Sequence, residues 1–90
     1  MRRVMKNLMV MAALLVGMTT FAQGGAEAHT RYGDRYYYQM AYKAAAEEYL
    51  VAAQLGAVNE HVTKRLAECY MKLADTENAE IWYAQVVKFL

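Results

Sequence analysis

The sequence contains no proline and only one cysteine, Cys69. A lone cysteine has no partner within the chain, so a disulfide framework is excluded. Proline ends or kinks a helix, and its absence leaves the chain from Arg31 onward without the strongest helix breaker. That stretch is dominated by alanine, glutamate, lysine, leucine, methionine and glutamine, which are good helix formers. The composition therefore predicts an all-α fold, within the one small domain that 90 residues allow.

The N-terminus lacks an apolar run long enough to be a typical membrane span. Its apolar run, Leu8–Met18, has eleven residues, whereas a membrane-spanning helix needs about 20. Three basic residues precede this run within the first six positions, and the small residues of "TTFAQ" follow it. This order predicts a secretory signal peptide over residues 1–22, cleaved after Ala22, which leaves no stable membrane span. An uncleaved N-terminal anchor is the alternative.

A concentration of basic charge is also missing after the predicted cleavage. Gln23–Leu90 contains seven basic and nine acidic residues, a net charge of −2, which argues against nucleic acid as a partner. No cysteine lies near residue 22, so a lipoprotein anchor is excluded as well. Residues 23–30, "QGGAEAHT", are small and polar and predict a flexible leader before a helical domain at 31–90.

Residues suited to catalysis or metal binding are few and badly spaced. The candidates are His29, Glu60, His61, Glu68 and Cys69. His61 and Cys69 are eight positions apart, roughly 12 Å along a helix, which is too far for both to bind one zinc ion. "QGGAEA" has neither the lysine nor the preceding strand of a phosphate-binding loop. The sequence predicts no enzyme, no catalytic residue, no metal and no cofactor. A small exported metal- or redox-binding protein acting through His61 and Cys69 is a second hypothesis.

Steps of three and four residues between apolar positions predict helical faces. Three such faces are formed by Tyr42, Ala45, Tyr49 and Ala52; by Val62, Leu66, Tyr70 and Leu73; and by Ala79, Tyr83 and Val86.

Capping residues predict where these helices begin and end. Gly56 can end one helix in the left-handed conformation, and "NE" at 59–60 is typical of the start of the next. "DTE" at 75–77 has the same character. The break at 40–41 has no such signal, so one long helix over 34–55 is an alternative there.

A period of 34 residues is the strongest pattern in the chain. The pairs that it relates are Tyr32 and Leu66, Gly33 and Ala67, Tyr36 and Tyr70, Ala45 and Ala79, Tyr49 and Tyr83, and Ala52 and Val86. Each pair keeps its size class. The period places a turn at 40–41, because these positions correspond to 74–75.

This period with helix–turn–helix units is the tetratricopeptide spacing, and the chain from about 26 to 90 resembles the tetratricopeptide repeat (TPR) family. "LAECY" at 66–70 has the family's large, small and aromatic positions of a first helix, and "YGDRY" at 32–36 is a looser version. Three features depart from the family pattern. His29 or Thr63 replaces the opening aromatic, Ala57 replaces the closing proline, and the turn at 40–41 lacks glycine or an acid.

The resemblance implies antiparallel helix pairs stacked as a short solenoid of about two repeats and four helices, at about 26–59 and 60–90. The small and aromatic positions predict a core, in which Ala79 lets its helix approach Ala67 and Tyr83 fills the space beside them. The predicted core residues are Tyr36, Ala45, Tyr49, Leu66, Ala67, Tyr70, Ala79 and Tyr83.

Polar residues of the 60–72 helix share one face. His61, Arg65, Glu68 and Lys72 follow at steps of four, three and four, with Lys64 beside them. The residues 34 positions earlier are Glu27, Arg31, Asp34 and Tyr38, with Thr30 and Tyr37 beside them. In the family that this chain resembles, first helices line a partner groove. The predicted groove residues are Tyr37, Tyr38, His61, Lys64, Arg65, Glu68 and Lys72. A solvated face with pairs such as Glu68 and Lys72 is the alternative.

These patterns predict a non-catalytic scaffold that binds a protein or peptide. A signal peptide before tyrosine-rich repeats resembles the N-terminal part of envelope proteins of Bacteroidota, some of them associated with type IX secretion. The resemblance implies an exported protein of the periplasm or outer-membrane periphery of a Gram-negative bacterium. The apolar end "VVKFL" predicts self-association through the last helix or continuation into a longer chain. A truncated fragment without independent function is a further alternative.

Overall fold

The computed structural model describes residues 24–90, and all regular structure in that range is helical. A first helix is present over 24–38, followed by α2 (Tyr42–Gln54), α3 (Glu60–Lys72) and α4 (Thr76–Val87). The all-α prediction is therefore confirmed. The predicted signal peptide at 1–22 lies outside the described residues. Among the residues described, no helix combines the length and apolar character that a membrane crossing needs.

The predicted flexible leader is wrong for residues 24–30, because they form the start of the first helix. Ala26 is buried, and the Thr30 hydroxyl donates to its carbonyl oxygen at 2.8 Å. Gly25 lies so close to the end of α2 that a Cβ there would be 3.1 Å from Leu55 Cδ1. Packing against α2 thus outweighs the weak helix propensity of the glycines.

The first helix ends in a turn that excludes the alternative of one long helix. Met40 has φ 63°, the left-handed region that residues other than glycine rarely adopt. The Ala41 amide donates to the Tyr36 carbonyl at 2.9 Å, which closes the helix end as a Schellman motif. The chain then enters α2 at Tyr42.

The same turn recurs 34 residues later. Ala74 has φ 58°, and the Asp75 amide donates to the Tyr70 carbonyl at 2.8 Å. The two turns therefore share the same backbone conformation, in addition to the 34-residue spacing of the sequence. It defines two helix–turn–helix units, the first containing the 24–38 helix and α2, the second containing α3 and α4.

The capping predictions are confirmed. The Asn59 side chain accepts from the Val62 amide at 2.9 Å, and the Asp75 side chain accepts from the Asn78 amide at 3.2 Å. Gly56 has φ 111° beyond the end of α2, as a left-handed C-cap requires.

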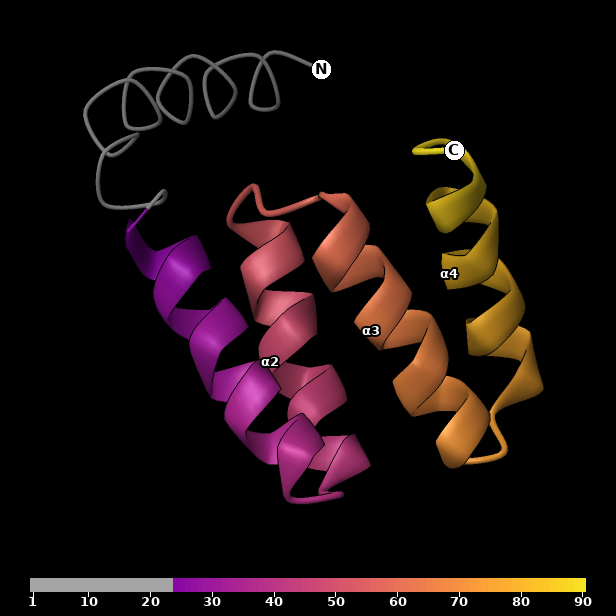
Figure 1. The fold of residues 1–90 in the computed structure, drawn as a ribbon, viewed down its shortest axis with the longest axis horizontal. Helices are drawn as coiled ribbons and strands as arrows, with labels where there is room; N and C mark the ends of the chain where they lie inside the picture. Colours follow the sequence, from indigo (N-terminus) through magenta and orange to yellow (C-terminus); the bar gives the residue numbers. More distant parts are fainter. Residues whose placement is uncertain (1–23) are drawn as a thin grey trace, which may run out of the picture.

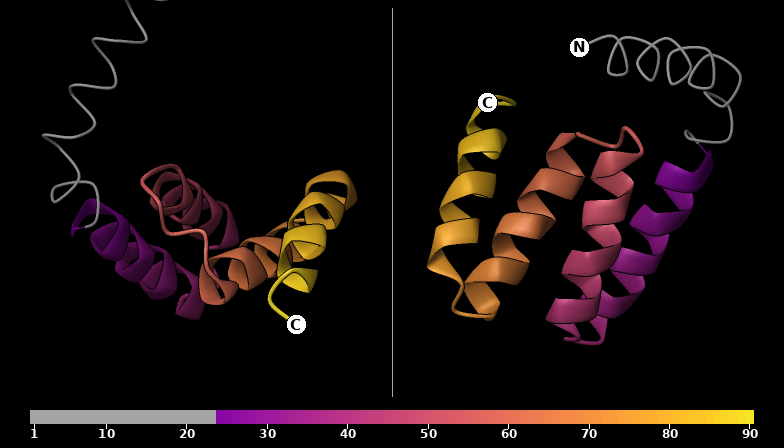
Figure 2. Two further views of the ribbon diagram at one scale, coloured as in Figure 1. Left: turned by 90° about the horizontal axis from the view of Figure 1, so that it is seen from above. Right: turned by 180° about the vertical axis from the view of Figure 1, so that it is seen from behind.

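The four helices stand in a row, with the first helix and α4 at its two ends (Figure 1). Seen from above, α2 stands out of the line that joins the first helix and α3 (Figure 2). It packs against both, and α4 packs against α3. This arrangement brings the first helix into direct contact with α3.

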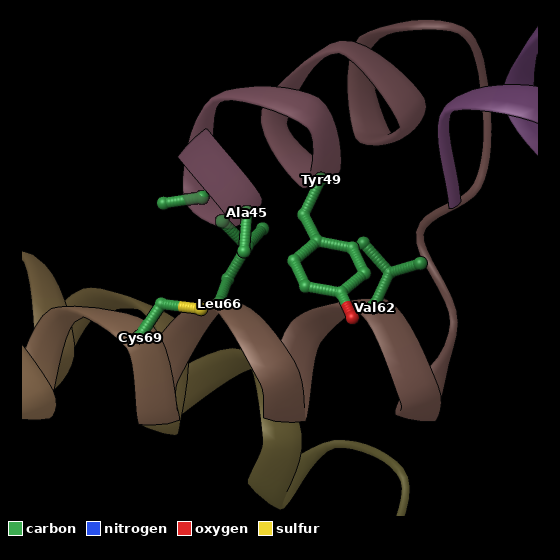
Figure 3. Packing of buried hydrophobic residues seen from close by; sticks show 6 residues of the cluster. Ala45, Tyr49, Val62, Leu66 and Cys69 are labelled. Carbon is green, nitrogen blue, oxygen red and sulfur yellow. The ribbon is translucent and has the colours of Figure 1, made fainter. Parts of the chain in front are cut away.

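The core is the contact between the two units. Its fully buried cluster contains Ala45, Ala46 and Tyr49 from α2 and Val62, Leu66 and Cys69 from α3 (Figure 3). The Tyr49 ring also lies over the first helix, since a Cβ at Gly33 would be only 2.6 Å from it. Glycine at 33 therefore lets the first helix and α2 approach this closely.

Most of the predicted core residues are buried or partly buried. Ala45, Tyr49, Leu66, Ala67 and Ala79 are buried as predicted. Tyr70 is partly buried and packs against the cluster.

Tyr36 and Tyr83, however, are 38% and 42% exposed, so their assignment to the core is wrong. Tyr49 is buried because α3 covers it, and among the described residues no helix covers the equivalent side of α4 or the outer side of the first helix. Both units thus share the spacing that places these tyrosines on an apolar helix face, but only the first unit has a neighbouring helix that covers that face.

This difference predicts unequal effects of the same substitution at two equivalent tyrosines. Tyr49→Ala is expected to lower the free energy of unfolding by about 3–5 kcal/mol, because a buried ring leaves a cavity. Tyr83→Ala is the matched control and should cost about 1 kcal/mol, because much of its area is already exposed. Urea unfolding followed by circular dichroism measures both. Equal losses would show that Tyr83 is a core residue after all.

Candidate functional site

Three of the predicted groove residues form a cluster between the first helix and α3. The Tyr37 hydroxyl donates to the Glu68 carboxylate, and Arg65 Nη1 donates to Glu68 Oε2 at 3.1 Å. The Arg65 guanidinium carbon lies 4.2 Å from the centre of the Tyr37 ring, within the range of a cation–π contact. Each of the three residues therefore contacts the other two.

The cluster is partly buried, which strengthens its hydrogen bonds. Arg65 and Glu68 expose only about a quarter of their side chains. The hydrogen bond to Glu68 raises the pKa of Tyr37, and partial burial adds to the effect. Tyr37 thus remains a proton donor to the carboxylate, and the polar atoms of this cluster are engaged with one another.

A second polar cluster centres on Asp34. Its carboxylate accepts from the buried Tyr49 hydroxyl and from His61 Nε2, the latter at 2.7 Å. Burial and the hydrogen bond to Asp34 raise the pKa of Tyr49. Asp34 therefore connects the first helix to both α2 and α3.

The first helix and α2 are joined by a further pair that the sequence did not predict. His29 Nδ1 lies 2.7 Å from Glu48 Oε2, and the two side chains are about one third exposed. The sequence carries no spacing signal for this contact, because it joins residues 19 positions apart on different helices.

The structure brings most of the predicted face together. Tyr38 lies beside the Tyr37 cluster, with the Arg65 guanidinium carbon 5.9 Å from its ring centre. His61 faces the first helix through Asp34. Lys64 and Lys72 are exposed, and neither forms an ion pair within residues 24–90. Glu68 is paired with Arg65 and Tyr37, not with Lys72.

The role of Asp34 was missed, although the repeat contained a signal for it. The 34-residue period pairs Asp34 with Glu68, and each of these acids accepts from a tyrosine of another helix. An acid at the same position in both units was visible in the sequence. Its partners were not, because they depend on which helices lie side by side.

His61 and Cys69 do not form a common site. His61 is exposed and bonded to Asp34, whereas Cys69 is fully buried in the α2–α3 cluster. Burial raises the pKa of the Cys69 thiol to about 11, and nearby Glu68 adds to the effect. Within residues 24–90 no three histidine, cysteine, aspartate or glutamate side chains are grouped as metal ligands. Nothing in this geometry favours a metal or redox role.

Comparisons of the chain with protein-family models, curated proteins and solved structures find no match. The geometry itself defines the class of the protein, which is an all-α chain with a repeated helix–turn–helix unit.

The buried thiol predicts a pH dependence of stability. The pKa of Cys69 is about 11 in the folded chain against 9.0 ordinarily, so folding favours the neutral thiol. Its contribution is complete below pH 9 and is lost as the pH rises through 11. Urea midpoints at neutral pH and at pH 10.5 should therefore differ more for the unmodified chain than for Cys69→Ala. The same alkaline loss in both proteins would contradict this account of Cys69.

Proposed function

We propose that this protein is a non-catalytic scaffold of the tetratricopeptide kind. It holds a peptide or protein segment on the face formed by the first helix and α3. The 34-residue period supports this proposal, together with the matching turns at Met40 and Ala74. The contact between the first helix and α3 supports it as well, since it makes one continuous surface from both units.

The exposed Tyr38 beside a cluster of satisfied polar groups is the observation that carries this function. Tyr37, Arg65 and Glu68 are held by one another, so they give the face a defined shape. Tyr38 is 73% exposed next to them. A tyrosine on a helix offers a large contact area at a small cost in side-chain entropy, and such residues often dominate binding.

The charges of the face indicate the chemistry of the partner. Asp34 and Glu68 are already engaged by donors from neighbouring helices. Lys64 and Lys72 are exposed on α3, and Met71 on the same helix adds an exposed apolar side chain. The face therefore suits a segment that presents carboxylates beside an aromatic or aliphatic side chain.

Two short synthetic peptides test this function. One carries aspartates around a phenylalanine, and the other carries lysines in their place. The acidic peptide should bind more tightly, and Tyr38→Ala or Lys72→Glu should weaken its binding by about tenfold. Fluorescence anisotropy measures the affinity. Lys43→Glu is the matched control, because Lys43 is exposed on α2, which does not belong to this face.

Equal binding of the two peptides, or an equal effect of Lys43→Glu and Lys72→Glu, would contradict the proposed face. Arg65→Glu is a poor probe, because it removes the contacts with Tyr37 and Glu68 and thereby lowers stability. Circular dichroism of each variant separates a loss of binding from a loss of fold.

The proposal places this scaffold in the cell envelope of a Gram-negative bacterium, in the periplasm or at the outer-membrane periphery. The basic, apolar and small-residue order of residues 1–22 supports export. Expression in such a host should yield periplasmic protein whose first residue is Gln23, as measured by intact mass. A full-length membrane-bound chain would support the anchor instead, and full-length chain in the cytoplasm would contradict export.

A further inference from the structure

The contact between the two units inside the chain can be compared with the surfaces at the two ends of the row of helices. Within the chain, α2 contributes Ala45, Ala46 and Tyr49 to this contact. The facing residues of α3 are Val62, Leu66 and Cys69 (Figure 3). Each side has an equivalent 34 residues away, at an end of the row of helices that no further helix covers within residues 24–90.

The outer side of α4 is the equivalent of the α2 side. It carries Glu80 and Tyr83 at the positions of Ala46 and Tyr49, whereas Ala79, the equivalent of Ala45, is already buried within the chain. Tyr83 is 42% exposed, and Val87 beside it is also exposed.

The outer side of the first helix is the equivalent of the α3 side. It carries Ala28, Tyr32 and Arg35 at the positions of Val62, Leu66 and Cys69. Tyr32 is 44% exposed. The two ends of the row therefore present the two halves of the contact that forms the core.

A hollow of about 320 Å³ marks the end formed by the first helix and α2. It is lined by Tyr32, Arg35, Tyr36 and Glu48. The residues 34 positions later are Leu66, Cys69, Tyr70 and Trp82, all of which belong to the core cluster or pack against it. The hollow is thus the equivalent of the surface on which α2 is seated inside the chain.

The two ends of the row carry charged residues where the internal contact has uncharged ones, and the charges at the two ends are of opposite sign. Ala46 and Cys69 share the buried internal cluster. Their equivalents are Glu80 on α4 and Arg35 on the first helix, both exposed and neither in an ion pair within the described part of the chain. One pair of charges opposes the contact. Asp34 and His61, which pair inside the chain, correspond to Glu68 of one copy and Glu27 of the next, so two carboxylates face each other there. Glu68 is already neutralised by Arg65.

We propose that copies of this chain associate head to tail, with the outer side of α4 of one copy seated on the first helix of the next. Tyr83 then enters the hollow beside Tyr32, in the way that Tyr49 packs on Leu66, and Glu80 faces Arg35. The contact is heterologous, because it joins two different surfaces, so it extends the row from copy to copy. It is independent of the Tyr38 face and goes beyond the scaffold function.

Charge reversal on the 90-residue chain tests this association. Sedimentation velocity over a dilution series should show concentration-dependent association of the unmodified chain. Arg35→Glu and Glu80→Arg should each weaken it by about tenfold or more, because each places like charges opposite one another. The double variant R35E/E80R should associate again, since it restores the pair with exchanged signs.

A mixture of the two single variants provides a second readout. Glu80→Arg offers an α4 side that matches the first helix of Arg35→Glu, and the reverse contact keeps the native pair of charges. The mixture should therefore form assemblies that neither variant forms alone. Circular dichroism establishes that each variant is folded. A chain that stays monomeric at every concentration would overturn the proposal. So would an effect of Glu80→Arg without one of Arg35→Glu, which indicates a symmetric α4–α4 contact.

Discussion

The packing of the Tyr49 ring is the contact on which the rest of the structure depends. The ring comes from α2, packs with Val62 and Leu66 of α3, and lies over the first helix where Gly33 has no side chain. Its hydroxyl would be costly to bury without a partner, and Asp34 accepts its hydrogen bond. A single side chain therefore joins three helices through one apolar and one polar contact.

The two acids related by the repeat order the face that we propose for partner binding. Asp34 and Glu68 each accept from a tyrosine and from a basic side chain, and they thereby connect helices that are distant in sequence. Because these groups satisfy one another, the residues left for the proposed partner are the outer ones, with Tyr38 foremost. The surfaces proposed for head-to-tail association lie at the ends of the row, so the two proposed interactions do not compete for the same residues.

The sequence predicted part of the candidate site, and the limit of that prediction is physical. Steps of three and four placed Arg65 and Glu68 on one helical face, and the repeat placed Tyr37 and Tyr38 beside them. The bonds from Tyr37 to Glu68 and from His61 to Asp34 cross from one helix to another. Periodicity describes the faces of one helix at a time, so it cannot identify partners 27 or 31 residues away.

By itself the sequence determined the later helices and their caps at Asn59 and Asp75, because propensity and capping are local properties. For the turn near Met40 the 34-residue period favoured a break but left one long helix as an alternative, which the structure excludes. Only the tertiary structure decided that residues 24–30 continue the first helix and that Tyr49 is buried while Tyr83 is not. Equivalent positions carry the same pattern of sizes, but burial depends on which helix covers each one. That covering helix is present for α2 and absent, within residues 24–90, for α4.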